Sequence, residues 1–381
     1  YLQHKILRRV RKSHKNRTCS SIYQSIAIMS TSAPPGPPPQ AIALDLATGN
    51  WKAQAVRSFV TTNIAGAMED LCKTENIFVS ADKIAEAADL HPAATYRLLR
   101  FLSTFDVCVE GPDKSFKLGP VGAVLTPNNP QSVASAVEWN ASLTLAVGLD
   151  KFDTFLKTNK SVAKEAFGGK DMWAHFAENP ETFAIFQKAM TGYSNEEAFF
   201  LFNPDLSPTF DLSGFKTVCD LGAAEGTLSL FLAKRFPDCE YILADLPEAV
   251  ARIDTAALPP TFSTEAVNFL DSVPKADAYV LKHIIHDWDD ENSEKILANI
   301  REANPDATVF ILEFGPMPGP NVPHMSKGFD CVMGVILSAC ERTQEEYNAL
   351  FSRCGYSNAK VHLLAGGGHP LYIQELKPVT E

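Results

Sequence analysis

A short apolar stretch, residues 278–281, is followed directly by a dense group of titratable side chains. The stretch has the pattern of a buried strand, and a helical pattern follows in which Ile296, Leu297 and Ile300 share one face. Open α/β sheets place chemistry where strands end, because the strand ends form a crevice. His286 is therefore the leading candidate for a general base. Its neighbours in the group are Lys282, His283, Asp287 and Trp288.

A second candidate segment, Asp220 to Gly226, runs from a predicted strand into a predicted helix and reads Asp-Leu-Gly-Ala-Ala-Glu-Gly. Gly222 and Gly226 would let a ligand approach the backbone closely at the helix N-terminus. The segment lacks the spacing G-x-G-x-x-G, and Glu225 disfavours a pyrophosphate but suits a positively charged ligand. Asp245 ends the next predicted strand, where a carboxylate suits a ribose diol. The alternative is structural, with a tight turn at the glycines and a helix cap at Asp245.

From about residue 210, strand-like apolar runs alternate with helical patterns. This alternation predicts an α/β fold whose mostly parallel sheet has helices on both faces. The last two strands are joined by residues 365–370, too few for a crossover helix, so we expect them to form an antiparallel hairpin. The predicted strands are 217–221, 241–244, 264–269, 278–281, 307–313, 359–364 and 371–376, and the predicted helices lie near 227–236, 247–257, 291–303, 324–338 and 343–354.

Residues 41–140 have helical patterns followed by a hairpin pattern. Ser80 is a predicted helix N-cap, and the next helix begins near Pro92. Two strand-like runs around a turn occupy residues 107–118. Helix, helix and hairpin in this order form a winged-helix arrangement. DNA reading would need a basic recognition helix, whereas the chain has a net charge of −11, so we expect packing or dimerisation and no nucleic-acid partner.

Residues 141–209 form a predicted helical connector that is rich in aromatic side chains. Most of these side chains would belong to the core by default. Some of them, together with Met190, could instead line an apolar pocket for a small molecule, and Phe186 is one candidate.

The composition is that of an ordinary globular chain of 381 residues, with 45% hydrophobic and 21% charged residues. No apolar run is long enough for a transmembrane helix, so we expect no membrane association. The eight cysteines form no C-x-x-C pair, which fits a reducing, cytoplasmic location rather than a zinc ribbon or a redox motif. No His and Asp cluster has metal spacing, so we expect neither a metal nor magnesium dependence.

Residues 1–40 are predicted to be a disordered leader. The first 28 residues are rich in Lys and Arg and lack Asp and Glu, as in a transit peptide. The alternative that we favour is that Met29 is the natural start and that the preceding residues are an artefact of a gene model. Residues 30–39 are rich in proline and cannot pack a core.

Taken together, these motifs resemble the S-adenosylmethionine-dependent O-methyltransferases of the caffeic acid, isoflavone and hydroxyindole type, a family of secondary metabolism. The resemblance spans roughly residues 45–378. It implies a Rossmann-like methyltransferase sheet, a winged-helix domain that builds a homodimer, and S-adenosylmethionine as the methyl donor, whose sulfonium fits the acidic loop. The stretches that carry it are Asp220-Leu-Gly-Ala-Ala-Glu-Gly226, Ala244-Asp-Leu-Pro247, Leu281-Lys-His-Ile-Ile-His-Asp-Trp-Asp-Asp-Glu291 and Glu341-Arg-Thr343.

The domain organisation expected on this basis has four parts. They are a leader (1–40), a winged-helix dimerisation domain (41–140), a helical connector with acceptor-pocket residues (141–209) and a donor-binding methyltransferase domain (210–381).

The resemblance also implies roles for individual residues. His286 matches the family's base, and Glu313 and Glu341 match the two acids that flank it. The expected donor-binding residues combine the positions that match the family with those of the glycine loop. They are Asp220, Gly222, Gly226, Asp245, Asn268, Phe269 and Lys282. The expected acceptor-pocket residues are Phe186, Met190 and Met333.

The sequence departs from the family pattern in three places. The usual Gly-Gly-Gly-Thr-Gly is Gly222-Ala-Ala-Glu-Gly226, and the usual Asp before the adenine contact is Asn268. The usual Gly-Gly-Lys before Glu341 is Ser338-Ala-Cys340. These departures leave the base and its acids intact, and they bear on cofactor affinity and on the identity of the acceptor.

The predicted reaction is O-methylation of a hydroxyl on a small aromatic acceptor. Methyl transfer from a sulfonium is an in-line displacement, so the enzyme must align the nucleophile and partly charge it. A phenol has a pKa of about 10 and histidine one of about 6.5, so complete proton transfer before attack would cost roughly 5 kcal/mol. Glu313 and Glu341 could offset this cost by stabilising the imidazolium.

Two rival functions remain open. One is a non-catalytic homologue that binds the donor and dimerises, which the altered glycine loop suggests. The other is a nicotinamide-dependent oxidoreductase, which the missing G-x-G-x-x-G and the position of Glu225 disfavour.

Overall fold

The computed structural model describes residues 37–72, 77–146, 151–203, 205, 207, 209–363 and 371–379. Most of the predicted leader and all of residues 365–370 lie outside the described residues. The chain divides into two compact units, 1–50 and 51–381, each of which is described by itself. No helix among the described residues is long and apolar enough to cross a membrane.

Helix α3 (Pro39–Ala47) lies in the first unit. Pro39 stands at the first helical position, where its missing N–H and fixed φ are tolerated. None of the residues of the helix is buried, and its apolar side chains Ile42, Leu44 and Leu46 are exposed. The helix therefore presents an apolar surface to its surroundings.

The elements that follow contain the predicted order of helix, helix and hairpin. They are α4 (Gly49–Thr61), α5 (Ile64–Leu71), β1 (Val79–Ser80), α6 (Ala81–Ala87), α7 (Pro92–Leu102), β2 (Cys108–Glu110), β3 (Ser115–Leu118) and α8 (Pro120–Ala123). Ser80 caps α6 by accepting a hydrogen bond from the backbone N–H of Lys83, and Pro92 begins α7, as predicted. Strands β2 and β3 pair antiparallel, and β1 pairs with β3. Phe59, Met68 and Leu99 lie in the core between these elements.

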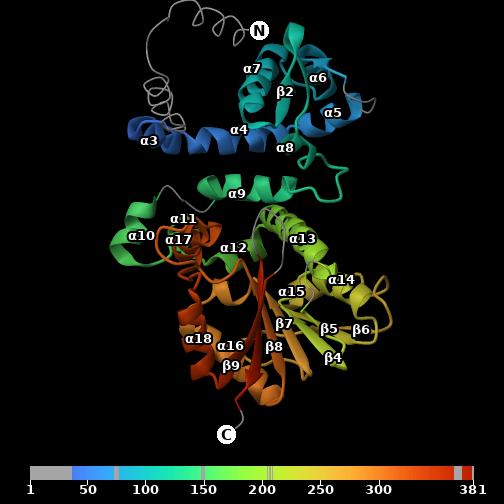
Figure 1. Ribbon diagram of the computed structural model, residues 1–381, viewed down its shortest axis with the longest axis vertical. Helices are drawn as coiled ribbons and strands as arrows, with labels where there is room; N and C mark the ends of the chain where they lie inside the picture. The colour runs from blue at the N-terminus through green and yellow to red at the C-terminus, as the bar shows by residue number, and fades with distance from the viewer. Residues whose placement is uncertain are drawn as a thin grey trace, which may run out of the picture. The chain divides into compact units, whose positions relative to one another are not determined.

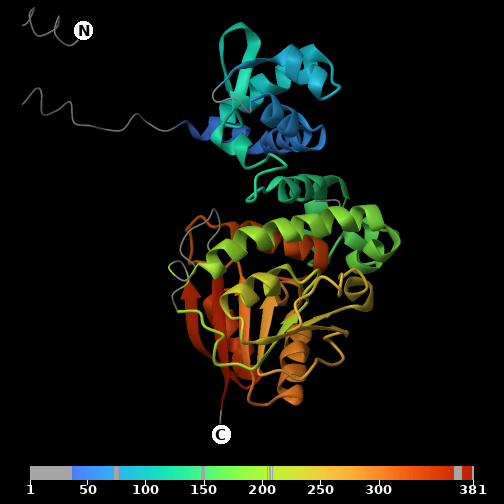
Figure 2. The ribbon, with the colours of Figure 1, turned by 90° about the vertical axis from the view of Figure 1, so that its right-hand side faces the viewer.

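The connector is helical, as predicted. Helix α9 (Ala134–Ala146) crosses the predicted boundary at residue 140. The helices within 141–209 are α10 (Phe152–Thr158), α11 (Ala163–Ala166), α12 (Met172–Glu178) and α13 (Pro180–Phe202). Figure 2 shows the long helix α13 crossing above the ends of the strands of the main sheet. This places a helix of the connector next to the strand ends that the sequence marked as chemically important.

The main sheet has seven strands in the order β6-β5-β4-β7-β8-β10-β9 (Figure 1). All neighbouring pairs from β6 to β8 are parallel, whereas β10 runs antiparallel to both β8 and β9. The predicted α/β fold, the mostly parallel sheet and the antiparallel final hairpin are therefore confirmed. The strands are β4 (Thr217–Leu221), β5 (Glu240–Asp245), β6 (Phe262–Ala266), β7 (Ala278–Lys282), β8 (Thr308–Glu313), β9 (Tyr356–Leu363) and β10 (Tyr372–Pro378).

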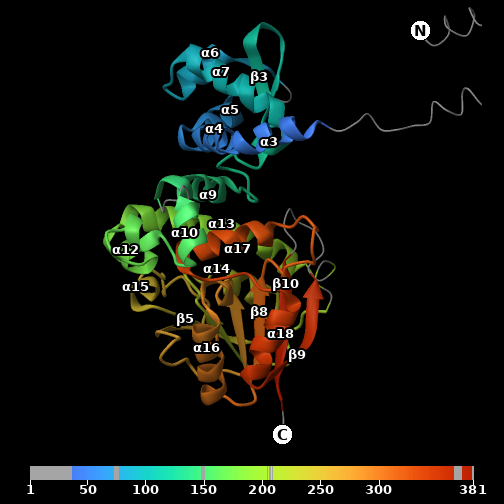
Figure 3. The same cartoon turned by 90° about the vertical axis from the view of Figure 1, so that its left-hand side faces the viewer.

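Helices cover both faces of this sheet, and side chains of β7 alternate between two cores. Tyr279 and Leu281 pack with residues of α16 and α18, which Figure 3 shows in front of the sheet. Ala278 and Val280 pack on the other face with residues of α13 and α14. The helices are α14 (Thr227–Arg235), α15 (Pro247–Val250), α16 (Asp290–Ala303), α17 (Met325–Leu337) and α18 (Gln344–Arg353).

Several bounds differ from the predicted ones: β9 begins at Tyr356 rather than at 359, and two elements end well before their predicted ends. Strand β6 ends at Ala266 rather than at Phe269, because the side chain of Asn268 accepts a hydrogen bond from the backbone N–H of Leu270 and turns the chain. Helix α15 ends at Val250 instead of extending to 257. Asp254 forms a similar turn with the N–H of Ala256.

Candidate active site

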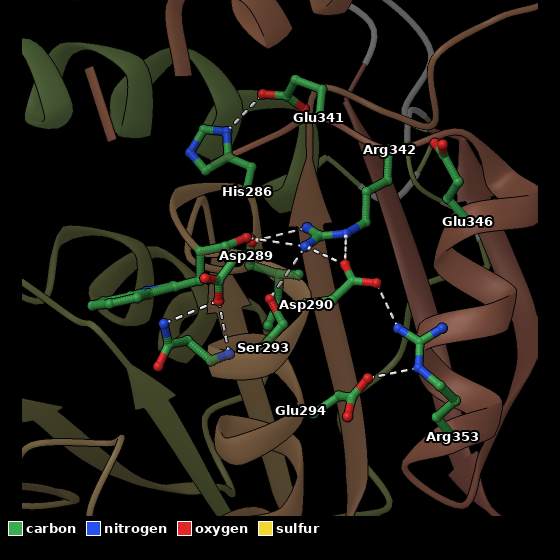
Figure 4. Close-up of polar contacts among 12 residues, drawn as sticks. His286, Asp289, Asp290, Ser293, Glu294, Glu341, Arg342, Glu346 and Arg353 are labelled. Atoms are coloured by element: carbon green, nitrogen blue, oxygen red, sulfur yellow. Dashed lines mark hydrogen bonds and ion pairs between the residues drawn. The ribbon is translucent and has the colours of Figure 1, made fainter. Parts of the chain in front are cut away.

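His286 is held at the end of β7 by carboxylates from two other parts of the chain. It lies in the short helix η4 (Ile285–Asp287), and its backbone N–H donates to Glu313 Oε1 over 3.2 Å. Its Nδ1 is 2.7 Å from Glu341 Oε1 and 3.6 Å from Glu313 Oε2. The structure thus brings together the three residues predicted as base and flanking acids, and Figure 4 shows the contact between His286 and Glu341.

The surrounding carboxylates make His286 a strong base. Burial opposes the charged imidazolium, but the negative charges of Glu313, Asp287 and Glu341 outweigh it and raise the pKa of His286 to about 10. Burial likewise opposes the ionised carboxyl of Glu313, yet the charge of His286 lowers the pKa of Glu313. With this pKa, the imidazole has nearly the proton affinity of a phenolate, whose conjugate acid has a pKa of about 10.

The segment Glu341-Arg342-Thr343 owes its position to a buried guanidinium. Arg342 donates to the carbonyl oxygens of Ile285 and Trp288 over 3.1 and 3.0 Å, and to Asp290 Oδ1 over 2.8 Å. Figure 4 shows the contact between Arg342 and Asp290, below His286 in this view. Thr343 then begins α18 with a reciprocal capping box. Arg342 therefore fastens the loop that carries Glu341 to the loop that carries His286.

A second buried histidine, His283, also contacts Glu313. Its Nδ1 lies 3.3 Å from Glu313 Oε2, and its Nε2 lies 2.6 Å from Glu197 Oε1 on α13. Glu197 Oε2 is in turn 3.3 Å from Lys282 Nζ. The backbone of His283 is left-handed, with a φ of +53°. Glu197 was not among the residues predicted from the sequence, because no motif marks it on α13.

The same cluster contains three possible metal ligands, which the sequence spacing did not suggest. Ligand atoms of His283, His286 and Glu313 lie within 4.8 Å of one another. The imidazole nitrogens that approach Glu313 are close enough for ion pairs with that carboxylate. Ion pairing is therefore sufficient to explain the cluster, and chemistry without a metal remains the expectation.

The glycine loop after β4 has left-handed backbone at two positions, a conformation that favours glycine. Gly222 and Gly226 have φ of +83° and +75°, and a Cβ at Gly222 would lie 2.3 Å from Ile284 Cδ1. Asp220 is buried at the end of β4 and accepts a hydrogen bond from Ser229 Oγ over 2.7 Å. Burial raises the pKa of Asp220 to about 6. Asp220 therefore anchors the start of α14, whereas Glu225 is exposed on the loop.

The other predicted donor-binding residues surround this loop. Asp245 accepts hydrogen bonds from the backbone N–H groups of Ala224 and Leu246, each over 2.7 Å, so it braces the loop from the next strand. Phe269 lies near Gly222, since its ring is 4.0 Å from where a Cβ would stand. Asn268 lies beside it in the turn after β6. Gly222, Gly226, Asp245, Asn268 and Phe269 thus form one neighbourhood.

The comparison with known families bears directly on this arrangement. A model of the O-methyltransferase domain matches residues 151–357, which is more than half of the chain. The chain belongs to the O-methyltransferase family. It is 27% identical over 347 residues to the phenazine O-methyltransferase PhzM of Lysobacter antibioticus, covering 90% of this chain and 97% of that protein.

Two further relatives extend the comparison. The chain is 28% identical over 303 residues to the cephaeline 6'-O-methyltransferase CiOMT of Carapichea ipecacuanha, covering 76% of this chain and 84% of that protein. It matches the SAH-bound structure of CalO1, a methyltransferase in calicheamicin biosynthesis, with a TM-score of 0.75 and 26% identity over 89% of this chain and 98% of that one. The predicted family, its S-adenosylmethionine cofactor and the activity as an O-methyltransferase are thereby confirmed.

Two departures of this O-methyltransferase from the family pattern fall where the backbone is left-handed. Ala224 stands at a glycine of the usual Gly-Gly-Gly-Thr-Gly and has a φ of +49°. Ser338 stands at a glycine of the usual Gly-Gly-Lys and has a φ of +60° at the C-cap of α17. A side chain in this conformation costs roughly 1–2 kcal/mol. Both replacements therefore place a side chain on left-handed backbone that favours glycine.

The predicted acceptor-pocket residues of this O-methyltransferase lie on two helices. Phe186 and Met190 on α13 are half-buried and pack against an aromatic cluster that includes Trp139 and Ile336. The rings of Phe186 and Trp139 meet edge to face at 5.2 Å. Met333 on α17 is half-buried but is not a member of this cluster among the described residues.

A cavity of about 390 Å³ lies against α17, but it does not have the expected lining. Its wall includes Phe155, Asp289, Asp290 and Asp330, and none of the three predicted acceptor-pocket residues. Three carboxylates do not make the apolar surface that a flat aromatic acceptor needs. The cavity therefore gives no support for an acceptor site at this position.

Proposed function

We propose that this O-methyltransferase transfers the methyl group of S-adenosylmethionine to a hydroxyl of a small aromatic acceptor, with His286 as the general base. The observation that carries the proposal is the position of His286, buried between Glu313 and Glu341 at the end of β7. Phenazine and cephaeline O-methyltransferases among the relatives support an acceptor with fused or linked aromatic rings.

The chemistry follows from the environment of the base. Bound S-adenosylmethionine supplies an electrophilic methyl group on a sulfonium. His286 withdraws the proton from the acceptor hydroxyl, and the resulting imidazolium is stabilised by Glu313 and Glu341. Because the pKa of His286 is close to that of a phenol, proton transfer to it is nearly neutral in free energy. The penalty of roughly 5 kcal/mol for an unperturbed histidine is thereby removed.

The donor site is proposed to lie at the glycine loop. Gly222 and Gly226 permit close approach of a ligand to the backbone, and Glu225 and Asp220 give the loop a negative character that suits a sulfonium. Asp245 retains lone pairs beyond its two backbone hydrogen bonds and is assigned to the ribose. The remaining donor contacts are assigned to Asn268, Phe269 and Lys282.

The acceptor is proposed to lie between α13 and α17, against Phe186, Met190 and Met333. All three are half-buried, so they can still contact a ligand. The four-part domain division at residues 40, 140 and 209 also stays a proposal.

The assembly is proposed to be a homodimer built by the N-terminal helical region. The support is the exposed apolar surface of α3, formed by Ile42, Leu44 and Leu46. We also propose a cytoplasmic location, which fits the free thiols of the seven cysteines among the described residues.

The proposal is tested by binding and turnover. We expect calorimetric titration to show binding of S-adenosylmethionine and of its demethylated product. Mass spectrometry with a deuterated methyl donor should then detect transfer to members of a panel of phenols, hydroxyphenazines and hydroxyindoles. His286→Ala should abolish turnover and leave donor binding nearly intact. Loss of donor binding in this variant would show a structural role for His286, and donor binding without transfer to any hydroxyl would favour a non-catalytic homologue.

A further inference from the structure

We propose that Glu197 and His283 act as a pair of positioning residues for His286, by holding Glu313 beneath it and tying α13 to the catalytic loop. The inference rests on the proposed function, in which His286 is the base. It assigns a role to two buried titratable groups that the methyl-transfer chemistry does not itself use.

The first support is an unbroken chain of alternating carboxylates and imidazoles. Glu197 Oε1 is 2.6 Å from His283 Nε2, and His283 Nδ1 is 3.3 Å from Glu313 Oε2. The same Glu313 oxygen is 3.6 Å from His286 Nδ1, which is 2.7 Å from Glu341 Oε1. Both nitrogens of His283 therefore face carboxylates. Only the doubly protonated ring can donate a hydrogen bond to each of them.

The second support is the way in which His283 is fixed. Its ring stacks on Phe314 with centroids 4.4 Å apart, and its backbone has a φ of +53°. A non-glycine residue with positive φ is uncommon and is maintained only where the surroundings enforce it. The ring is thus clamped in the one orientation in which it bridges Glu197 and Glu313.

The third support is the balance of charge around the two histidines. The ionisable groups that face them come from five elements or loops: Glu197 on α13, Lys282 on β7, Asp287 on η4, Glu313 on β8 and Glu341 before α18. Tyr347 on α18 interacts with Glu313 and Glu341. Burial opposes the charged form of His283, but Glu197 and Glu313 together outweigh it and raise the pKa of His283. A charged His283 keeps Glu313 ionised, and an ionised Glu313 keeps His286 basic.

A purely structural pair would not require this chemistry. Replacing a buried ion pair by apolar residues of similar volume is often neutral or stabilising, so packing alone does not explain a buried Glu197. Glu197 could instead act in the donor site by positioning Lys282, since Lys282 Nζ is 3.3 Å from Glu197 Oε2. The experiment must therefore separate an effect on the base from an effect on donor binding.

The first measurement follows ring protonation and needs no acceptor. Ring ¹⁵N chemical shifts of labelled histidine are recorded against pH for the wild type and Glu197→Gln, with His283→Asn to assign the signal. Asn is suitable because it tolerates a positive φ. We expect His283 to remain an imidazolium through neutral pH in the wild type, and its pKa to fall by about one unit or more in Glu197→Gln. Superimposed titration curves would overturn the proposal.

The second measurement uses turnover with an acceptor found in the screen. Glu197→Gln and His283→Asn should each lower kcat on the order of 10- to 100-fold and move the pH profile of kcat, while the Kd for S-adenosylmethionine stays within about twofold of the wild type. The double variant should be no slower than the slower single variant, because both changes break the same chain. A weakened Kd with unchanged kcat would instead assign Glu197 to the donor site, and additive losses would refute coupled action.

A matched control is provided by another carboxylate–imidazole pair. His362 on β9 is buried, and its Nε2 lies 2.9 Å from Glu375 Oε2 on β10. Glu375→Gln removes a carboxylate from a buried histidine outside the candidate site, so kcat and its pH profile should not change. An equal change in this control would mean that loss of any such pair disturbs the enzyme, and it would overturn the proposal. Absence of turnover in the wild type would refute the proposed function, whereas the chemical-shift titration would still decide the role of Glu197.

Discussion

Replacing Glu341 by glutamine removes a negative charge from the side of His286 while keeping an oxygen that can accept its Nδ1–H. The two atoms are 2.7 Å apart and both side chains are buried, so the interaction is weakly screened. An opposite charge at this range shifts a pKa by about 1–3 units. Glu313 and Asp287 remain, so the pKa of His286 should fall from about 10 to between about 7 and 9.

The sign of the effect can be read from a pH profile. A base whose pKa is raised is protonated at neutral pH, and its neutral form increases as the pH rises toward that pKa. With an acceptor whose own pKa is near 10, kcat/KM of the wild type should therefore rise up to about pH 10. In Glu341→Gln the rise should level off about 1–3 pH units earlier and at a lower plateau, because a weaker base is less well matched to a phenol.

The control for Glu341→Gln is a substitution at a nearby exposed glutamate. Glu345 is exposed in the first turn of α18, and Glu345→Gln removes a neighbouring charge outside the site, so its pH profile should follow that of the wild type. If Glu341→Gln levels off at the same pH as the wild type, Glu341 does not set the proton affinity of His286. The assignment of Glu341 as a flanking acid would then be wrong.

Two further predictions concern the donor loop. Asp245→Ala should weaken S-adenosylmethionine binding more than tenfold in calorimetry, because it removes both the ribose ligand and the brace of the Ala224 N–H, and unchanged binding would remove the ribose assignment. Ala224→Gly should relieve the strain at a φ of +49° and raise the free energy of unfolding by up to about 1 kcal/mol in denaturant titrations, whereas a clear loss of stability would show that the methyl group of Ala224 packs favourably.

The sheet was predictable because its strands are locally encoded. Apolar runs such as 217–221 and 278–281 have the length and composition of buried strands, and β4 was predicted with both of its ends. The short link between the last two strands indicated an antiparallel hairpin, which is confirmed. The sequence did not show that β10 inserts between β8 and β9, because strand order depends on long-range packing.

The site was predictable only in part, for a related reason. His286, Glu313 and Glu341 follow recognisable motifs, and the structure brings them together. The partner of His283 lies 86 residues earlier, on a helix with no recognisable motif, so no local pattern links Glu197 to it. The hydrogen bonds of Asp245 could not be predicted from the sequence either, since their donors are backbone N–H groups, which almost every residue has.

The second histidine resolves a difficulty that the flanking acids create. Two carboxylates close to one imidazole repel each other, and in a buried site such repulsion is usually relieved when one of them takes up a proton. A neutral Glu313 would no longer raise the pKa of His286. The cationic His283, stabilised by Glu197 from outside the cluster, removes the reason for Glu313 to protonate. Under the proposed function, the strength of the base would therefore depend on Glu197 of α13, and we expect a change at this residue to alter catalysis without contact to donor or acceptor.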